Sequence, residues 1–81
     1  MRLSYSERFL KSINHAPAQV RKAFAKQAEF LLRDLRHSSL HAKKYDETND
    51  IWQARVNKDW RFYFSIEGEE YRLHDIMAHP G

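Results

Sequence analysis

The sequence has no cysteine among its 81 residues, which excludes disulfides, thiolate zinc ligands and a cysteine nucleophile. It has only two glycines, and neither belongs to a Gly-rich loop of the kind that cradles phosphate groups. No apolar run approaches the ~20 residues that a membrane-spanning helix needs, and no signal peptide is visible. These absences lead us to expect a protein of the reducing cytoplasm with no membrane contact.

The residues that are present suffice for a hydrophobic core. Hydrophobic residues make up 42% of the chain and aromatic residues 14%, so global disorder is not expected. No internal repeat or low-complexity tract divides the chain. We therefore predict a single small domain over residues 1–81, with the modest stability that chains of this length have.

The charge is unevenly distributed along the chain. Residues 1–44 contain ten Lys or Arg and three Asp or Glu, whereas residues 45–81 contain four and eight, within a net charge of +3. A basic half of this kind suits nucleic acid or an acidic protein partner. A well-solvated helix surface is the alternative explanation.

Three short runs rich in aromatic and β-branched residues dominate the last third of the chain: Ile51–Val56, Trp60–Ile66 and Tyr71–Met77. Asn, Asp and Gly separate them, which is typical of an antiparallel meander. The central run alternates apolar residues with Arg, Tyr and Ser, so one face needs a cover and the other is open to chemistry. In the last run, Leu73 and Ile76 share a face only if a β-bulge lies between them, and otherwise Ile76 points to the other face.

Two amphipathic helices are predicted before the meander. Ser6 is a suitable N-cap for a helix that begins at Glu7 and ends before Pro17. A second helix is expected from about Pro17 to Arg36, because its apolar residues recur at helical spacing. These residues are Val20, Phe24, Ala28, Leu31, Leu32 and Leu35.

The remaining segments complete the predicted architecture. Arg2–Tyr5 is expected to be an edge strand, and His37–Asp50 a polar connection that Leu40 and Tyr45 pin to the body. The order is then β-α-α-β-β-β. It predicts an α+β fold in which a helical hairpin packs on one face of an antiparallel sheet.

The arginines of the meander are the clearest candidates for a site. Arg55 and Arg61 share the face away from the helices if Val56 pairs near Trp60, and they are then neighbours on adjacent strands. Like charges opposite each other cost stability, and an anion between them would relieve that cost. Histidine suits acid–base work near neutrality because its ordinary pKa is ~6.5. A planar arginine fork suits phosphate oxygens.

The segment from Ile51 to Phe64, with its Arg-Val, short turn and Trp-Arg, resembles the RelE/ParE superfamily of bacterial toxins. The connection Leu40–Tyr45 and the ending Ile76–His79 are similar to segments of the same superfamily. The resemblance implies the toxin of a type II toxin–antitoxin pair that cleaves mRNA on the ribosome without a metal or other cofactor. It also implies a cognate antitoxin protein as partner.

Site residues follow from the resemblance position by position. It implies catalytic roles for Arg55, Asp59, Arg61 and His79, with His79 as acid or base and Arg61 as the phosphate-binding arginine. From the residues themselves, Lys43, Lys44 and His41 are candidates for phosphate contact, Trp60 for stacking on a base, and Tyr63 for substrate contact. The alternatives are core packing for Trp60, a turn role for Asp59, surface packing for Tyr63 and a frayed end for His79.

Two other functions stay open on the sequence. A non-enzymatic inhibitor directed at gyrase, like the ParE branch, would use the same fold, but Arg61 and His79 favour the nuclease. An inactive homologue that only binds its antitoxin is the other possibility. Zinc is not expected, because no recognised ligand spacing is present.

Overall fold

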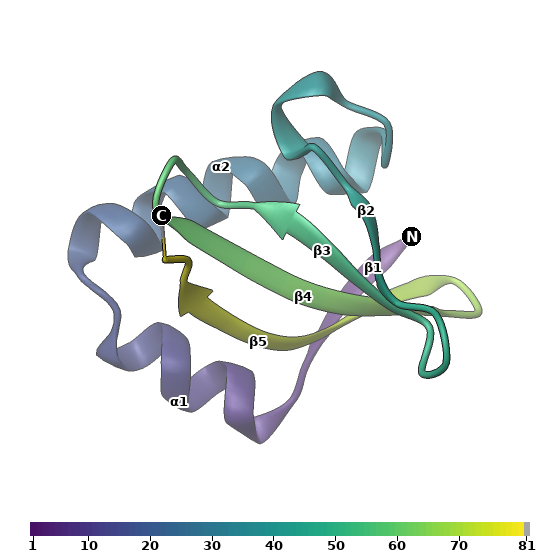
Figure 1. The fold of residues 1–81 in the computed structure, drawn as a ribbon, viewed down its shortest axis with the longest axis horizontal. Coiled ribbons are helices and arrows are strands. Elements are labelled where there is room, and N and C mark those ends of the chain that lie inside the picture. The colour runs from purple at the N-terminus through teal and green to yellow at the C-terminus, as the bar shows by residue number, and fades with distance from the viewer. Residues whose placement is uncertain (81) are drawn as a thin grey trace.

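The computed structural model describes residues 1–80. Its elements are β1 (Arg2–Tyr5), α1 (Glu7–His15), α2 (Ala18–Arg33), a 3-10 turn η1 (Ser38–Leu40), β2 (Lys43–Asp46), β3 (Ile51–Arg55), β4 (Trp60–Glu67) and β5 (Glu70–Ala78). The strands form one sheet in the order β1-β5-β4-β3-β2, and both helices pack against it (Figure 1). The predicted α+β class, with a helical hairpin and a C-terminal meander, is confirmed.

Helix α1 begins and ends where local chemistry predicts. The Ser6 side chain accepts a hydrogen bond from the backbone N–H of Phe9 at 3.0 Å, which satisfies one of the free donors of the first turn. Ala16 is extended, as expected for a residue before proline. The Ser6 hydroxyl also donates to the carbonyl of His74 at 2.9 Å and so ties the start of α1 to β5.

Helix α2 is shorter than the sequence predicts. It ends at Arg33, and Asp34 is extended with φ −162°. The Asp34 carboxylate accepts a hydrogen bond from the backbone N–H of Arg36, a local bond that competes with continuing the helix. Leu35 therefore lies outside the helix but still packs against the core. No helix within residues 1–80 is long and apolar enough to cross a bilayer.

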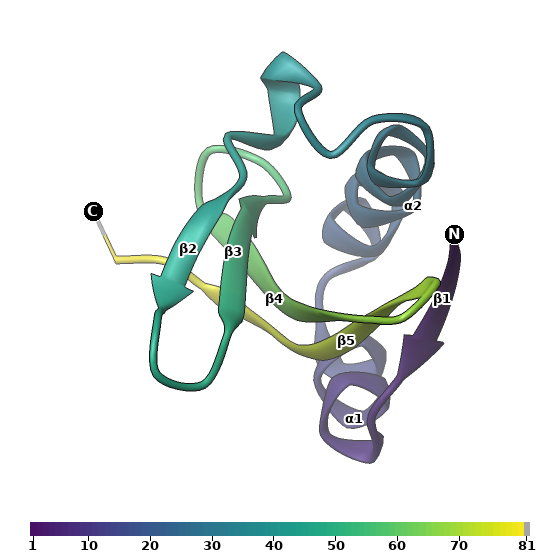
Figure 2. The ribbon, with the colours of Figure 1, turned by 90° about the vertical axis from the view of Figure 1, so that its right-hand side faces the viewer.

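The core lies between the helices and one face of the sheet, as Figure 2 shows from the side. Phe24 of α2 contacts Phe9 of α1 and Phe62 of β4, with ring centroids 5.1 and 5.2 Å apart. Phe62 and Phe64 are fully buried, so the predicted cover over this face is confirmed. Ile66 was expected on the same covered face, and that was wrong. It is 41% exposed because it lies at the far end of β4, beside the β4–β5 turn.

The connection between residues 37 and 50 contains a strand that the sequence pattern did not predict. Lys43–Asp46 forms β2 and pairs antiparallel with β3. It is an edge strand of polar residues, so it has none of the apolar alternation that identifies a strand in the sequence. Leu40 is fully buried, as expected. Tyr45 is 61% exposed, and it touches the body through an edge contact with the ring of Tyr63.

The sheet is not wholly antiparallel. β1 runs parallel to β5, with Arg2 opposite Glu70 and Tyr5 opposite Leu73. Of the two arrangements that the spacing of Leu73 and Ile76 allows, β5 has the bulge, because the register with β4 shifts between Tyr63 and Phe64. The shift brings Leu73 and Ile76 onto the same face, and both are buried.

Candidate functional site

Arg55 and Arg61 face each other across the β3–β4 turn. The backbone N–H of Val56 donates to the carbonyl of Trp60 at 2.9 Å, which closes the turn. This register places Arg55 directly opposite Arg61. The expectation that the two arginines are neighbours on adjacent strands is therefore confirmed, and their Cβ atoms are about 5 Å apart, as in any directly opposed pair.

The two guanidinium groups differ in their surroundings. Nη1 of Arg61 lies within hydrogen-bond distance of three carbonyl oxygens of the turn: those of Asn57 at 2.8 Å, Trp60 at 3.0 Å and Lys58 at 3.3 Å. Nε of Arg55 is buried and has no hydrogen-bond partner among residues 1–80. Arg61 is thus anchored by the backbone, whereas Nε of Arg55 is desolvated without a compensating hydrogen bond among residues 1–80.

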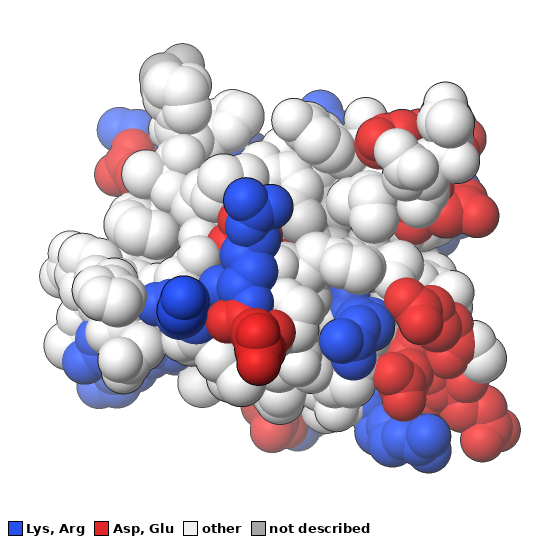
Figure 3. Space-filling view, turned by 90° about the horizontal axis from the view of Figure 1, so that it is seen from below, with Lys and Arg blue, Asp and Glu red and all other residues white. Residues whose placement is uncertain are grey.

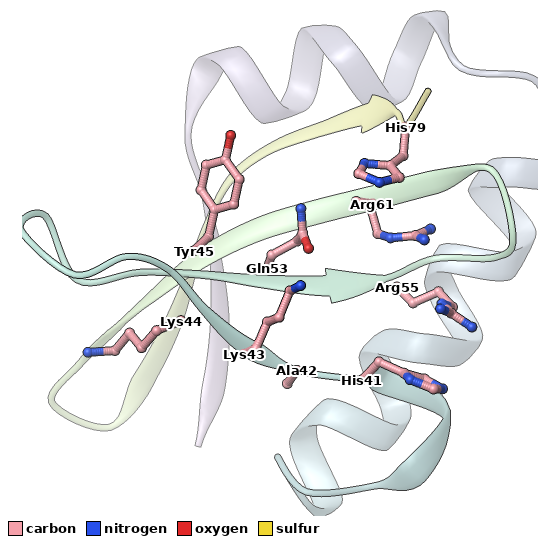
Figure 4. A pocket seen from close by; sticks show the side chains of 9 residues that line it. All are labelled: His41, Ala42, Lys43, Lys44, Tyr45, Gln53, Arg55, Arg61 and His79. Carbon is pink, nitrogen blue, oxygen red and sulfur yellow. The ribbon is translucent and has the colours of Figure 1, made fainter. Parts of the chain in front are cut away.

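A cavity of about 660 Å³ lies beside this pair. Figure 4 shows its lining, which comes from the segment after η1, from β2, β3 and β4, and from the chain after β5. Within residues 1–80, no Asp or Glu lines the cavity. The lining residues are His41, Ala42, Lys43, Lys44, Tyr45, Gln53, Arg55, Arg61 and His79.

Two histidines lie at the arginine end of this cavity. The backbone N–H of His79 donates to the carbonyl of Asp59 at 2.6 Å, which holds the segment after β5 beside the start of β4. His41 follows η1 in the left-handed conformation, at φ 47° and ψ 42°. A non-glycine residue in this conformation carries strain that its surroundings must support. In Figure 4 the side chains follow one another in the order His79, Arg61, Arg55, His41.

Among the residues predicted to bind substrate, Lys43 has its ammonium facing the cavity (Figure 4). Lys44 also borders it, but its ammonium points away and donates to Asp50 at 2.6 Å. This hydrogen bond, with the charges of Asp50 and Glu47, raises the pKa of Lys44 above its ordinary value. The same ammonium lies 5.6 Å from the centre of the Trp52 ring. Its charge is therefore already paired on the other side of β2.

Three predicted site residues do not line the cavity. The Asp59 side chain is exposed on the β3–β4 turn, and its backbone carbonyl is the group that holds His79. Trp60 packs against the hydrophobic core. Tyr63 is buried beneath the cavity, where its hydroxyl accepts a hydrogen bond from Gln53 at 3.1 Å.

Sequence reasoning missed Tyr45 and Gln53, which line the cavity at the end away from the arginines (Figure 4). Neither residue type signals a site by itself. The β-bulge that places Tyr45 has no sequence signature, since it lies where the β2–β3 register shifts between Lys44 and Asp46.

Acidic residues gather at the end of the molecule opposite to Arg55 and Arg61. Figure 3 shows them on the side where the β2–β3 and β4–β5 turns lie in Figure 1. The first turn carries Asp46, Glu47 and Asp50, and the second carries Glu67, Glu69 and Glu70. The cavity therefore has a cationic end near the chain's C-terminal segment and an acidic turn beyond its other end.

No protein-family model matches this chain. No curated protein matches it by sequence. Solved structures do match it in three dimensions. A YoeB/ParE toxin from Agrobacterium tumefaciens superimposes with a TM-score of 0.81 at 12% identity, over 99% of this chain and 100% of the toxin. The chain has the fold of the RelE/ParE toxins.

Other toxins with this fold give the same result. RelE from the RelB–RelE complex of Methanococcus jannaschii matches with a TM-score of 0.76 at 17% identity, over 93% of this chain and 88% of that chain. The isolated E. coli RelE toxin matches with a TM-score of 0.75 at 17% identity, over 98% and 84%. These likenesses establish the RelE/ParE fold, and the activity has to be argued from the side chains.

Proposed function

We propose that this chain is the toxin of a type II toxin–antitoxin pair and that it cleaves mRNA without a metal ion. The observation that carries the proposal is the row His79, Arg61, Arg55, His41 along one end of a cavity whose described lining has no carboxylate (Figure 4). Two opposed cations attract a phosphate. An imidazole lies on either side of the pair, and this type of side chain suits proton transfer in either direction.

The proposed chemistry uses each group once. A phosphodiester group binds between Arg55 and Arg61, and both guanidinium groups donate to its oxygens. One imidazole takes the proton of the 2′-hydroxyl as this oxygen forms a bond to phosphorus. The other gives a proton to the 5′-oxygen as its bond to phosphorus breaks. The arginines stabilise the charge that builds up on the phosphorane.

The partners of the proposed toxin follow from its chemistry and its fold. The substrate is mRNA, presented on the ribosome in the cytoplasm, where ribosomal RNA supplies positioning that so small a chain lacks. RelE of Methanococcus jannaschii forms a complex with the antitoxin RelB. We propose by analogy that a small cognate antitoxin binds and silences this chain.

Expression of the chain alone tests the proposal. We expect growth and translation to stop, and His79→Ala and His41→Ala each to restore growth, because a positioned acid or base contributes roughly 10²–10⁴-fold to the rate. His15→Ala is the matched control, since His15 is exposed on α1 and does not line the cavity. It should remain fully toxic.

Mapping of RNA ends then identifies the target. Primer extension on translated mRNA should show cuts that follow the codon frame. A His79→Ala variant that stays fully toxic would remove the catalytic role of this residue. Growth arrest with intact mRNA and a DNA-damage response would instead support the gyrase-directed alternative. Arrest by neither route, with antitoxin binding retained, would indicate an inactive homologue.

A further inference from the structure

Tyr45 is an exposed aromatic side chain at the end of the cavity away from the arginines. It is 61% exposed, and its ring makes an edge contact with the ring of Tyr63, at 5.0 Å between centroids and 64° between planes. It is also the extra residue of the bulge in β2. Bulges re-aim side chains and recur beside functional sites. This bulge places an exposed aromatic surface, not a core residue, at the edge of the cavity.

Gln53 forms the floor beside this ring. Its side chain is buried, and its Nε2 donates to the hydroxyl of Tyr63 at 3.1 Å. Tyr63 therefore orients both the ring of Tyr45 and the carboxamide of Gln53. Lys43 lies directly opposite Gln53 in the β2–β3 pairing. Figure 4 shows the Gln53 carboxamide between Tyr45 and the arginine end of the cavity.

Charge decides which part of a nucleotide fits each end. A phosphate is attracted to the end with Arg55 and Arg61, whereas the turn that follows Tyr45 carries three carboxylates, of which Glu47 and Asp50 are paired with Lys44. An uncharged base has no such preference. Gln53 and Arg55 are two residues apart on β3, which is about 6.6 Å along the strand. A single nucleotide can therefore place its phosphate at Arg55 and its base near Tyr45.

We propose that Tyr45 and Gln53 form a nucleobase subsite, in which a base of single-stranded RNA stacks on Tyr45 while its edge faces Gln53. The inference rests on the proposed function, since the phosphate of the same RNA lies between the arginines. Stacking tolerates all four bases because each has a π-face. Any base preference at this position then comes from the Gln53 carboxamide.

Direct binding of short single-stranded RNA tests the subsite. The protein carries His79→Ala so that the RNA is not cut, and affinity is measured by fluorescence anisotropy with oligonucleotides that lack one base at successive positions. Tyr45→Leu should weaken binding of the intact RNA about 5- to 30-fold, which corresponds to the lower half of the range for base–aromatic stacking. Tyr45→Trp should retain the wild-type affinity. Leucine keeps the apolar contact with Tyr63 but has no π-face.

The RNA that lacks the stacked base is the internal check. For this oligonucleotide Tyr45→Leu should cost nothing further, whereas every other abasic RNA should show the same loss as the intact one. Tyr5→Leu is the matched control, because Tyr5 is a 43% exposed tyrosine that does not line the cavity. Thermal unfolding of each variant checks that the fold is intact.

Each outcome separates the subsite from the proposed function. Binding that is lost in Arg55→Met but unchanged in Tyr45→Leu would overturn the subsite and leave the phosphate site in place. An equal loss with every abasic RNA would also overturn stacking. Unchanged RNA affinity with weakened antitoxin binding would make Tyr45 a protein contact instead. If the His79→Ala chain binds neither free RNA nor mRNA on the ribosome, both proposals fail.

Discussion

The side-chain amide of Gln27 in α2 donates a hydrogen bond to the backbone carbonyl of Arg55, at 2.8 Å across 28 residues of sequence. The same Nε2 donates to the carbonyl of Ser39 at 3.1 Å, and Oε1 accepts from the Ser39 hydroxyl at 3.2 Å. Ser39 belongs to η1, which ends at Leu40, immediately before His41. One buried glutamine thus holds both sides of the arginine end of the cavity.

Replacement of Gln27 by leucine should therefore destabilise the protein. The change leaves the carbonyls of Arg55 and Ser39 without this donor in a buried setting, at a cost of about 1–3 kcal/mol in the free energy of unfolding. Urea denaturation measures the loss. Gln19→Leu on the exposed surface of α2 is the control and should stay within about 0.5 kcal/mol of the wild type. Equal stabilities for the two variants would mean that the Gln27 bonds contribute nothing net.

The opposed arginines predict the reverse effect. Arg55→Met removes one of two like charges that face each other, together with a buried donor that has no partner. We expect it to raise the free energy of unfolding by about 1 kcal/mol in anion-free buffer. It should also abolish growth arrest. Arg33→Met, an exposed change at the end of α2, should alter neither.

Inorganic phosphate allows a second test of the pair formed by Arg55 and Arg61. A ligand that binds only the folded state raises its stability as the ligand concentration increases. Added phosphate should therefore stabilise the wild-type protein more than Arg55→Met at equal ionic strength. A destabilised Arg55→Met variant with an unchanged phosphate response would show that Arg55 serves packing and not anion binding.

The fold could be predicted from the sequence where local patterns determine structure. The Ser6 cap and the burial of Phe62 and Phe64 on one face of β4 depend on neighbouring residues, and both were confirmed. β2 could not be predicted, because an exposed edge strand of Lys, Lys, Tyr and Asp carries no hydrophobic period. The parallel pairing of β1 with β5 joins residues at opposite ends of the chain, and local spacing contains no information about it.

The same distinction applies to the site. Arg55 and Arg61 are six residues apart across one turn, so their opposition followed from strand parity and turn length. His41 lines the cavity because its own backbone is left-handed, and Tyr45 because it lies in the bulge of β2. Neither backbone feature is specified by the residue type. Stacking on a base was assigned to Trp60, whose parity with Phe62 instead places it against the core.

Asp75 fastens α1 to the sheet at the bulge of β5. Its Oδ1 accepts hydrogen bonds from the hydroxyl of Ser12 at 2.6 Å and from the backbone N–H of Ile76 at 2.8 Å. Asp75→Ala should lower the free energy of unfolding by about 1–3 kcal/mol, because both donors are partly buried. Asp59→Ala, an exposed change on the β3–β4 turn, is the control for stability. Similar chemical denaturation midpoints for the two variants would contradict a fastening role.

Ionisation of Tyr71 should make the free energy of unfolding depend on pH in the alkaline range. Its side chain is buried against Phe64, with ring centroids 5.6 Å apart. Burial, with the nearby charge of Asp34, raises the pKa of the Tyr71 hydroxyl above its ordinary value of 10.0. The unfolded chain therefore releases this proton at a lower pH than the folded chain does. Stability from the neutral phenol is fully present below pH 10.0 and is lost as the pH rises through the folded pKa.

Part of the loss of stability above pH 10.0 should depend on this hydroxyl. A difference of one proton gives a slope of at most about 1.4 kcal/mol per pH unit. Tyr71→Phe removes the phenol but keeps the ring, so the fall in the free energy of unfolding with pH should be shallower in this variant. Urea denaturation at several alkaline pH values measures the slope, with Tyr5→Phe as the exposed control. The same slope in the wild type and in Tyr71→Phe would show that ionisation of Tyr71 is not coupled to folding.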